Sequence, residues 1–355
     1  MESKSVSRRS FIGKTALTAG FTALGAGSMY GKPDNLSPSP SPQERGVQLQ
    51  GRLPREVWIA TVSQSGISAE TPAKMVKLIF PVLEKCIVYR PDIICLPEVF
   101  MYNWVRPDMN LLKEAALAEE LLQEFKAFAR TNQCYMICPI LTAENGKIYN
   151  SAVVIDRQGN RMGEYRKIYL PDDEVKLKIT PGPLQPPVFK ADFGIFGIQI
   201  CYDINWRQGW ESLRQQGAEI VFWPSAFPGG QMINAKAWQN KYVVVSSTRD
   251  RSKICDISGE EIAQTGAVGD RNFICAPVNL EKIFLHSWPF SQRFDEIKAK
   301  YGRKVRIINY HEEQWSIIES LSPDVRVKDI LAEFELRTFE QLIHDSEIKN
   351  VNIRG

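Results

Sequence analysis

Short apolar runs alternate with helical patterns over the first part of the folded chain. The runs at 57–62 and 93–96 have the length and composition of buried strands. Between them, Thr71 and Pro72 supply an N-cap and a first-turn proline for a helix with apolar residues three and four apart. A second amphipathic pattern covers 114–130. The sequence therefore predicts strand, helix, strand and helix in that order.

Strand patterns dominate the next part of the chain. Segments 135–141, 151–156 and 161–167 are separated by polar, glycine-bearing turns, which predicts antiparallel hairpins. Further strands are expected at 188–193, 195–201, 218–223, 243–247 and 274–278, with helices near 210–215 and 235–241. This order indicates a mixed α/β layer structure rather than a strict βαβ repeat.

The two ends of the chain differ from this central domain, which we place at 55–280. Segment 1–30 carries Arg8-Arg9 before a weakly apolar, alanine- and glycine-rich stretch, and it resembles a twin-arginine export signal. Segment 31–54 is rich in proline and serine and reads as an extended linker. We expect a periplasmic or secreted mature protein without a membrane span.

Beyond the domain, charged segments at 293–300, 312–320 and 327–348 look helical. We therefore interpret 281–355 as a C-terminal helical extension that wraps the domain or a neighbouring subunit.

Composition narrows the possible functions. The formal charge of +3 is small for 355 residues, so nucleic acid is not expected as a partner. The seven cysteines lie mostly in apolar runs and are expected to be free thiols. The three histidines, His286, His311 and His344, all lie in the last quarter. A Ser-His-Asp, Cys-His or histidine-rich zinc site would need an imidazole from that quarter.

Cys201 is the cysteine best placed for catalysis. The run Gly197-Ile198-Gln199-Ile200 precedes it, and polar and aromatic residues follow at once. This change is typical of a strand-to-helix elbow, which presents a side chain near backbone NH groups that can stabilise an oxyanion. The alternative is a buried structural thiol, which is our interpretation of the other six cysteines.

Glu98 and Lys167 stand at two further strand ends. Partial burial of Glu98 would raise its pKa toward that of a general base, which a thiol nucleophile needs. The ammonium of Lys167 can stabilise an oxyanion and lower the pKa of a nearby thiol. Taken alone, each is more often a solvated surface residue. Together with Cys201 they occupy three strand ends, where open α/β structures place ligand sites.

The order and local text of these motifs resemble the nitrilase, or carbon-nitrogen hydrolase, superfamily over about 57–278. The matching motifs are Leu96-Pro97-Glu98, Tyr149-Asn150-Ser151-Ala152 with Asp156 and Gly159, Tyr165-Arg166-Lys167, Gly197 to Asp203, and Gly217-Ala218-Glu219 with Trp223-Pro224-Ser225. The resemblance implies an α/β fold, a four-layer αββα sandwich that forms homodimers or larger homo-oligomers, and no metal or organic cofactor. It implies Glu98 as general base, Lys167 as oxyanion-stabilising cation and Cys201 as nucleophile of a thioester mechanism.

Several further residues are candidates near this site. The family often has a second glutamate, for which Glu174 is the nearest candidate, although it also fits a solvated acidic turn. An Arg-Phe-Pro-Glu type run after the nucleophile is replaced by Asn205-Trp206-Arg207-Gln208. Arg207 can pair with a substrate carboxylate. Further candidate substrate contacts are the aromatic residues Tyr102, Tyr202 and Trp206, which equally suit the core.

The function expected from these residues is hydrolysis of a small amide or N-carbamoyl compound, with release of ammonia or an amine. Three alternatives remain open. An acyltransferase would use the same thioester with an amine acceptor, a nitrilase would act on a nitrile, and a non-catalytic binding module would keep only the fold.

Overall fold

The computed structural model describes residues 53–266 and 272–354. The predicted export signal 1–30, and the linker 31–54 apart from its last two residues, lie outside these ranges. Among the helices within them, none is long and apolar enough to cross a membrane.

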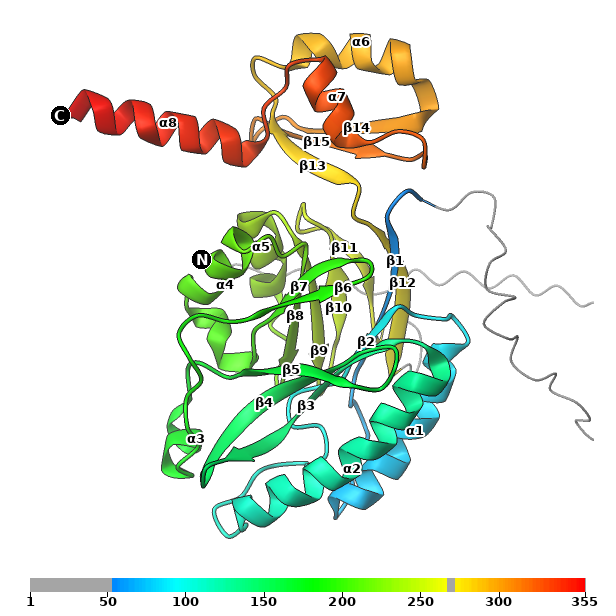
Figure 1. The fold of residues 1–355 in the computed structure, drawn as a ribbon, viewed down its shortest axis with the longest axis vertical. Helices are drawn as coiled ribbons and strands as arrows, with labels where there is room; N and C mark the ends of the chain where they lie inside the picture. The colour runs from blue at the N-terminus through cyan, green and yellow to red at the C-terminus, as the bar shows by residue number, and fades with distance from the viewer. Residues whose placement is uncertain (1–52, 267–271, 355) are drawn as a thin grey trace, which may run out of the picture. The chain divides into compact units, whose positions relative to one another are not determined.

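Six strands form the first sheet. They are β1 (Glu56–Val62), β2 (Ile93–Cys95), β3 (Tyr135–Glu144), β4 (Lys147–Ile155), β5 (Arg161–Arg166) and β12 (Phe273–Asn279). Their order is β12-β1-β2-β3-β4-β5 (Figure 1). Strands β1, β2 and β3 are parallel, whereas β3, β4 and β5 form an antiparallel meander. The hairpins predicted from the turn sequences are thus confirmed.

Six more strands form the second sheet. They are β6 (Val188–Ala191), β7 (Gly194–Ile198), β8 (Ile220–Ser225), β9 (Val243–Thr248), β10 (Lys253–Cys255) and β11 (Glu261–Gln264), in the order β11-β10-β9-β8-β7-β6. The strand predicted at 195–201 ends early, because Cys201 opens the short 3-10 helix η2 (Cys201–Asn205). Asp203 Oδ2 accepts the backbone NH of Ile200 at 2.9 Å and so turns the chain out of the sheet.

Helices cover the outer face of each sheet. Helices α1 (Pro72–Ile87) and α2 (Leu111–Asn132) pack on the first sheet, as Figure 1 shows, and α4 (Gln208–Gln215) and α5 (Gln231–Asn240) pack on the second. A third apolar cluster fills the space between the sheets. These layers confirm the predicted αββα sandwich.

The central strands of the two large sheets bury side chains on both of their faces, as β8 illustrates. Ile220 and Phe222 point into the core between the sheets, whereas Val221 and Trp223 point toward the helices. This alternation follows from the two-residue period of a strand. Because both faces are buried, such strands read as continuous apolar runs in the sequence.

Hydroxyl groups join the two sheets near the ends of β1 and β9. Thr61 Oγ1 donates to the carbonyl of Ser246 at 2.6 Å. The Ser247 hydroxyl lies 2.8 Å from the carbonyl oxygen of Val62 and 2.9 Å from that of Cys95. Both hydroxyls are buried, and the carbonyls of the opposite sheet segment give each of them an acceptor. This seam fixes the sheet ends from which the site loops emerge.

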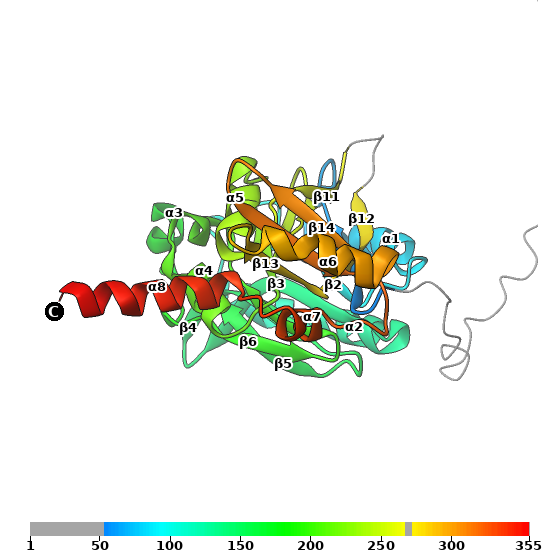
Figure 2. The ribbon, with the colours of Figure 1, turned by 90° about the horizontal axis from the view of Figure 1, so that it is seen from above.

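The C-terminal part contains a third sheet in addition to helices. Its strands are β13 (Lys282–His286), β15 (Trp315–Ser320) and β14 (Val305–Tyr310), in that order, and its helices are α6 (Ser291–Tyr301), α7 (Val327–Glu333) and α8 (Phe339–Arg354). Helices α6 and α7 share an apolar cluster with this sheet (Figure 2).

The helix predicted at 312–320 was therefore wrong. Its last six residues form β15, the central strand, which pairs with β13 and β14. Ile317 belongs to the apolar cluster that also fills the space between the large sheets, and Ile318 packs with residues of α6 and α7. Two-sided burial and pairing, which are tertiary effects, outweigh the local polar composition.

We expect Phe222→Ala to lower the free energy of unfolding by about 3–5 kcal/mol, because truncating a buried aromatic ring leaves a cavity. Phe222 is fully buried, and its ring meets that of Phe196 edge-on with centroids 5.6 Å apart. Urea unfolding measures the change. The control Leu184→Ala, at a side chain that is 75% exposed, should stay within about 0.5 kcal/mol of wild type. Equal losses of unfolding free energy in the two variants would contradict the burial of Phe222 in the core.

Candidate active site

The structure brings Glu98, Lys167 and Cys201 together at the carboxyl ends of β2, β5 and β7. Glu98 lies three residues after β2, Lys167 directly follows β5, and Cys201 begins η2. The carboxylate of Glu98 interacts with both the Lys167 ammonium and the Cys201 side chain. These residues are separated by up to about a hundred positions in the chain, so only the sheet topology makes them neighbours.

Lys167 is held by a ring of hydrogen bonds. Its Nζ donates to Oε1 of Glu98 at 2.9 Å and to Oε1 of Glu174 at 3.0 Å. Asn150 Nδ2 donates to the same two oxygens, at 2.9 and 2.8 Å. The Lys167 side chain is only 1% exposed. Glu174, which lies in α3 (Asp172–Lys176), is therefore part of the charged cluster rather than of a solvated turn.

The charges of this cluster set its protonation. Burial opposes the charge of Glu98, but the ammonium of Lys167 and hydrogen bonds hold the pKa of Glu98 below its ordinary value. Burial also opposes the charge of Lys167, but the two carboxylates raise its pKa. Burial and the charge of Glu98 raise the pKa of Glu174 to about 7. Glu98 is thus the ionised carboxylate at neutral pH, contrary to the raised pKa expected from its sequence context.

The pKa of the Cys201 thiol is shifted in the opposite direction to that of Glu98. Burial and the charge of Glu98 raise its pKa to about 12, although Lys167, Ser225 and the backbone NH of Ala226 lower it. The thiol is therefore protonated at neutral pH and needs a base before it can attack. The ionised Glu98 is beside it, held also by the Ala226 NH, which donates to Glu98 Oε2 at 2.9 Å.

The backbone at Cys201 has the elbow geometry expected from the sequence. Its φ of 46° lies in the left-handed region, which L-residues other than glycine rarely adopt. The indole of Trp223 donates to the Cys201 carbonyl at 3.0 Å and helps to hold this conformation. The turn directs the thiol away from the strand axis.

Asp203 is a buried residue whose role the sequence did not reveal. Its carboxylate accepts hydrogen bonds from the Tyr165 hydroxyl at 2.6 Å and from the backbone NH groups of Tyr169 and Ile200 at 2.8 and 2.9 Å. It therefore ties the segment that carries Lys167 to the elbow that carries Cys201. The sequence signal that could have indicated this role is a carboxylate two residues after the nucleophile, between Tyr202 and Ile204.

The other predicted contacts are spread around the site. Tyr102 lies in the core, and its hydroxyl donates to the Glu114 carbonyl at 3.0 Å. Trp206 stacks on Tyr169 with ring centroids 3.9 Å apart, and Tyr202 meets the Trp206 ring edge-on at 5.1 Å. Tyr202 and Trp206 thus belong to an aromatic group directly after Cys201.

Arg207 forms its ion pair with Glu211 rather than with the cluster of Glu98, Lys167 and Cys201. Its side chain is 80% exposed, and the pair spans 2.8 Å along α4. Such i,i+4 pairs on a helix surface are ordinary solvated contacts.

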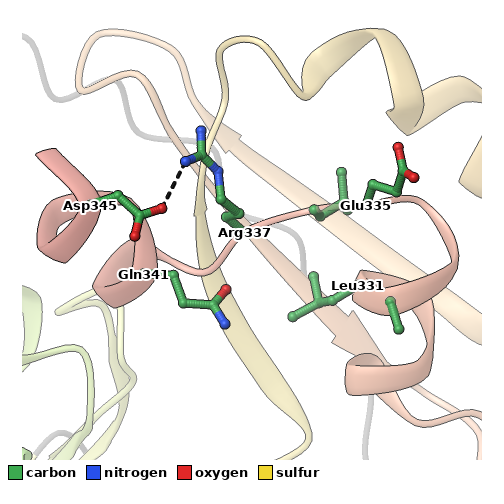
Figure 3. Close-up of a pocket in the computed structure, with 7 residues that line it drawn as sticks. Leu331, Glu335, Arg337, Gln341 and Asp345 are labelled. Carbon is green, nitrogen blue, oxygen red and sulfur yellow. Dashed lines mark hydrogen bonds and ion pairs between the residues drawn. The ribbon is translucent and has the colours of Figure 1, made fainter.

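A pocket of about 420 Å³ lies in the C-terminal part (Figure 3). It is lined by Leu331, Ala332, Glu335, Leu336, Arg337, Gln341 and Asp345. Arg337 is paired with Asp345 at 2.9 Å, and the lining includes no cysteine, serine, threonine or lysine. Within the described residues, no group of three or more His, Cys, Asp or Glu side chains is arranged to hold a metal ion.

Glu174→Gln should remove a pH-dependent part of the stability. The ordinary pKa of glutamate is 4.5 and that of Glu174 is about 7, so between these values the folded protein keeps a proton that the unfolded chain releases. Stability from this group therefore falls as the pH rises through that range. We expect the wild-type free energy of unfolding, relative to that of the variant, to fall from about pH 5 to about pH 8. Parallel pH profiles from urea unfolding would contradict the raised pKa.

Comparison with known proteins places the chain in a family. The family model for carbon-nitrogen hydrolases matches residues 59–265. A deaminated glutathione amidase of Dictyostelium discoideum is 27% identical over 193 residues, which cover 47% of this chain and 66% of the relative. A beta-ureidopropionase of Arabidopsis thaliana is 29% identical over 200 residues, covering 51% of this chain and 48% of the relative. The chain thus spans about half to two thirds of the length of these curated relatives.

Solved structures agree on the fold. Nit3 of Saccharomyces cerevisiae, a member of the nitrilase superfamily, superposes with a TM-score of 0.57 at 19% identity, over 64% of this chain and 91% of that protein. An amidase from Nesterenkonia sp. gives a TM-score of 0.57 at 18% identity, over 72% and 99% of the two chains. The resemblance to the nitrilase superfamily inferred from the sequence is confirmed. The chain belongs to the carbon-nitrogen hydrolase family.

Proposed function

We propose that this protein hydrolyses the carbon-nitrogen bond of a small amide or N-carbamoyl compound through a thioester on Cys201. One observation carries the proposal: an ionised carboxylate, a buried ammonium and a protonated thiol share one site. These are the base, the oxyanion-stabilising cation and the nucleophile that such a reaction needs.

In the first half of the reaction, Glu98 takes the proton from the Cys201 thiol as the sulfur attacks the substrate carbonyl carbon. The carbonyl oxygen then becomes an oxyanion. An ammonium has three N–H donors, and two of those on Lys167 bond to Glu98 and Glu174. The third is the donor for the oxyanion.

Collapse of this intermediate breaks the carbon-nitrogen bond. Glu98 gives its proton to the departing nitrogen, so ammonia or an amine leaves and a thioester remains on Cys201. In the second half, Glu98 takes a proton from water, whose oxygen attacks the thioester carbonyl. The carbon-sulfur bond breaks, the thiolate recovers the proton, and the acid is released. The carboxylate thus returns to its starting state.

The identity of the relatives supports amide and carbamoyl compounds over nitriles. Those named above are a deaminated glutathione amidase and a beta-ureidopropionase. Acyl transfer would differ only in the second half, where an amine would replace water. Hydrolysis is the simpler proposal because it needs no second substrate site.

We expect Cys201→Ala to abolish ammonia release from a panel of small amides and N-carbamoyl amino acids, because the variant has no nucleophile. The loss should be at least about 10³-fold in kcat. Cys275→Ala, at another partly buried free thiol, is the matched control and should retain activity. Mass spectrometry of the wild-type protein during turnover should show the acyl group on Cys201. Equal ammonia release by wild type and Cys201→Ala would refute the mechanism.

We also propose that the protein is exported in the folded state by a twin-arginine route. The proposal rests on Arg8-Arg9 and the weakly apolar stretch after them. All seven cysteines are free thiols, so the fold does not require an oxidising compartment to form.

Replacement of Arg8 and Arg9 by lysine should therefore keep the protein in the cytoplasm. Lysine preserves the charge, so a loss of export would report recognition of the arginine pair itself. Cell fractionation and immunoblotting measure the distribution. Unchanged export of the double variant would exclude this route.

A further inference from the structure

A second pocket lies beside the loop that begins at Glu98. It has a volume of about 210 Å³ and is lined by Gln64, Ile67, Ser68, Asn103, Trp104 and Arg249. These residues come from the loops after β1, β2 and β9. A parallel bridge between Ser63 and Thr248 joins two of these loops at their bases. The pocket is therefore built at the sheet edge that also carries the candidate active site.

The loops around this pocket are firmly held. The Asn103 side chain donates to the Ala69 carbonyl at 2.7 Å and accepts the Ala69 NH at 3.3 Å. Gln64 Nε2 donates to the carbonyl of Phe100, two residues after Glu98, at 2.7 Å. Gln64 is thus tied to the loop that begins at Glu98.

Two polar groups in this pocket have no partner among residues 53–266 and 272–354. Gln64 is 5% exposed, and its buried Oε1 accepts no hydrogen bond from any described residue. The buried Nε of Arg249 likewise donates to none, and its guanidinium forms no ion pair within 53–266 and 272–354. Buried groups of this kind normally have a partner, so a ligand with complementary chemistry is expected. The pocket offers one cationic donor and one neutral acceptor.

The guanidinium of Arg249 also lies within electrostatic reach of the reacting groups. Burial lowers the pKa of Arg249, and the charges of Glu98 and Cys201 act in the opposite direction. Its Cζ lies 4.9 Å from the centroid of the Trp104 ring, which orients the guanidinium plane. Trp104 itself is 69% exposed and forms an apolar wall.

We propose that Arg249 binds a carboxylate at the far end of the substrate. The inference rests on the proposed amide hydrolysis and names its substrate class: a short amide or N-carbamoyl compound that ends in a carboxylate. Arginine binds carboxylates through two parallel hydrogen bonds. The pocket holds the volume of about seven waters, which suits a short acid.

Arg249 therefore replaces Arg207, the residue expected from the sequence, as the partner that we propose for the substrate carboxylate. Arg207 is exposed and already paired with Glu211. Arg249 is partly buried in a pocket and is unpaired among the described residues. Neutralising a partly desolvated cation by a substrate carboxylate stabilises binding more than the same contact in water.

The test compares succinamate with butanamide, two primary amides that differ in the terminal carboxylate. In wild type, kcat/KM should favour succinamate. In Arg249→Gln this preference should fall about 10- to 100-fold, mainly through a higher KM, because a charge-assisted bidentate contact is lost. Arg207→Gln and Arg251→Gln, which remove exposed charges, are the matched controls and should keep the preference.

A second measurement separates this inference from the proposed hydrolysis. Calorimetry with the Cys201→Ala protein should detect succinamate binding, and the added Arg249→Gln change should weaken it by the same factor. If succinamate binding depends on Arg249 but the wild-type protein releases no ammonia, the carboxylate site is supported and the proposed hydrolysis is refuted. The inference would be overturned if both amides are hydrolysed and the preference for succinamate is unchanged in Arg249→Gln or is lost in Arg207→Gln. In that case the proposed hydrolysis would still stand.

Discussion

The burial of the Lys167 ammonium between two carboxylates is the constraint on which the site depends. A charge removed from water is costly unless partners replace its hydration, and here Glu98, Glu174 and Asn150 do so. The partners come from the end of β2, from α3 and from β4, so one ion cluster fixes three separate segments. Removal of one partner from such a cluster typically costs about 3–5 kcal/mol, because it leaves an uncompensated buried charge.

The same cluster decides which group holds the proton. With Lys167 at 2.9 Å, Glu98 stays ionised despite its burial. The negative charge of Glu98, added to burial, keeps Cys201 as a thiol. Before substrate binds, the site therefore contains the ionised base Glu98 and the protonated thiol of Cys201. The thiol loses its proton only as the sulfur attacks the substrate. Glu174 accepts a second hydrogen bond from the ammonium, while burial and the charge of Glu98 raise the pKa of Glu174 to about 7.

The sandwich provides the frame for this chemistry. The central parallel strands of the two sheets end near one another, and the hydroxyl seam between β1 and β9 fixes those ends. The loops that follow carry the charged cluster and, beside it, the pocket of Arg249. The C-terminal sheet packs against the same core through Phe284 and Ile317. Close to this contact the Lys241 ammonium lies 4.0 Å from the Trp238 ring and 4.3 Å from the Phe284 ring, which joins α5 to β13.

By itself, the sequence determined the hairpins, most of the strands and helices, the family and the three strand-end residues Glu98, Lys167 and Cys201. Those features follow from local periodicity, turn chemistry and ordered motifs, which a single chain displays. The tertiary structure alone decided the sign of the Glu98 pKa shift, the linking role of Asp203, the strand at 315–320 and the burial of Arg249 in a pocket while Arg207 stays in solvent. Each depends on desolvation and on contacts between residues distant in sequence, and neither exists until the sheets have packed.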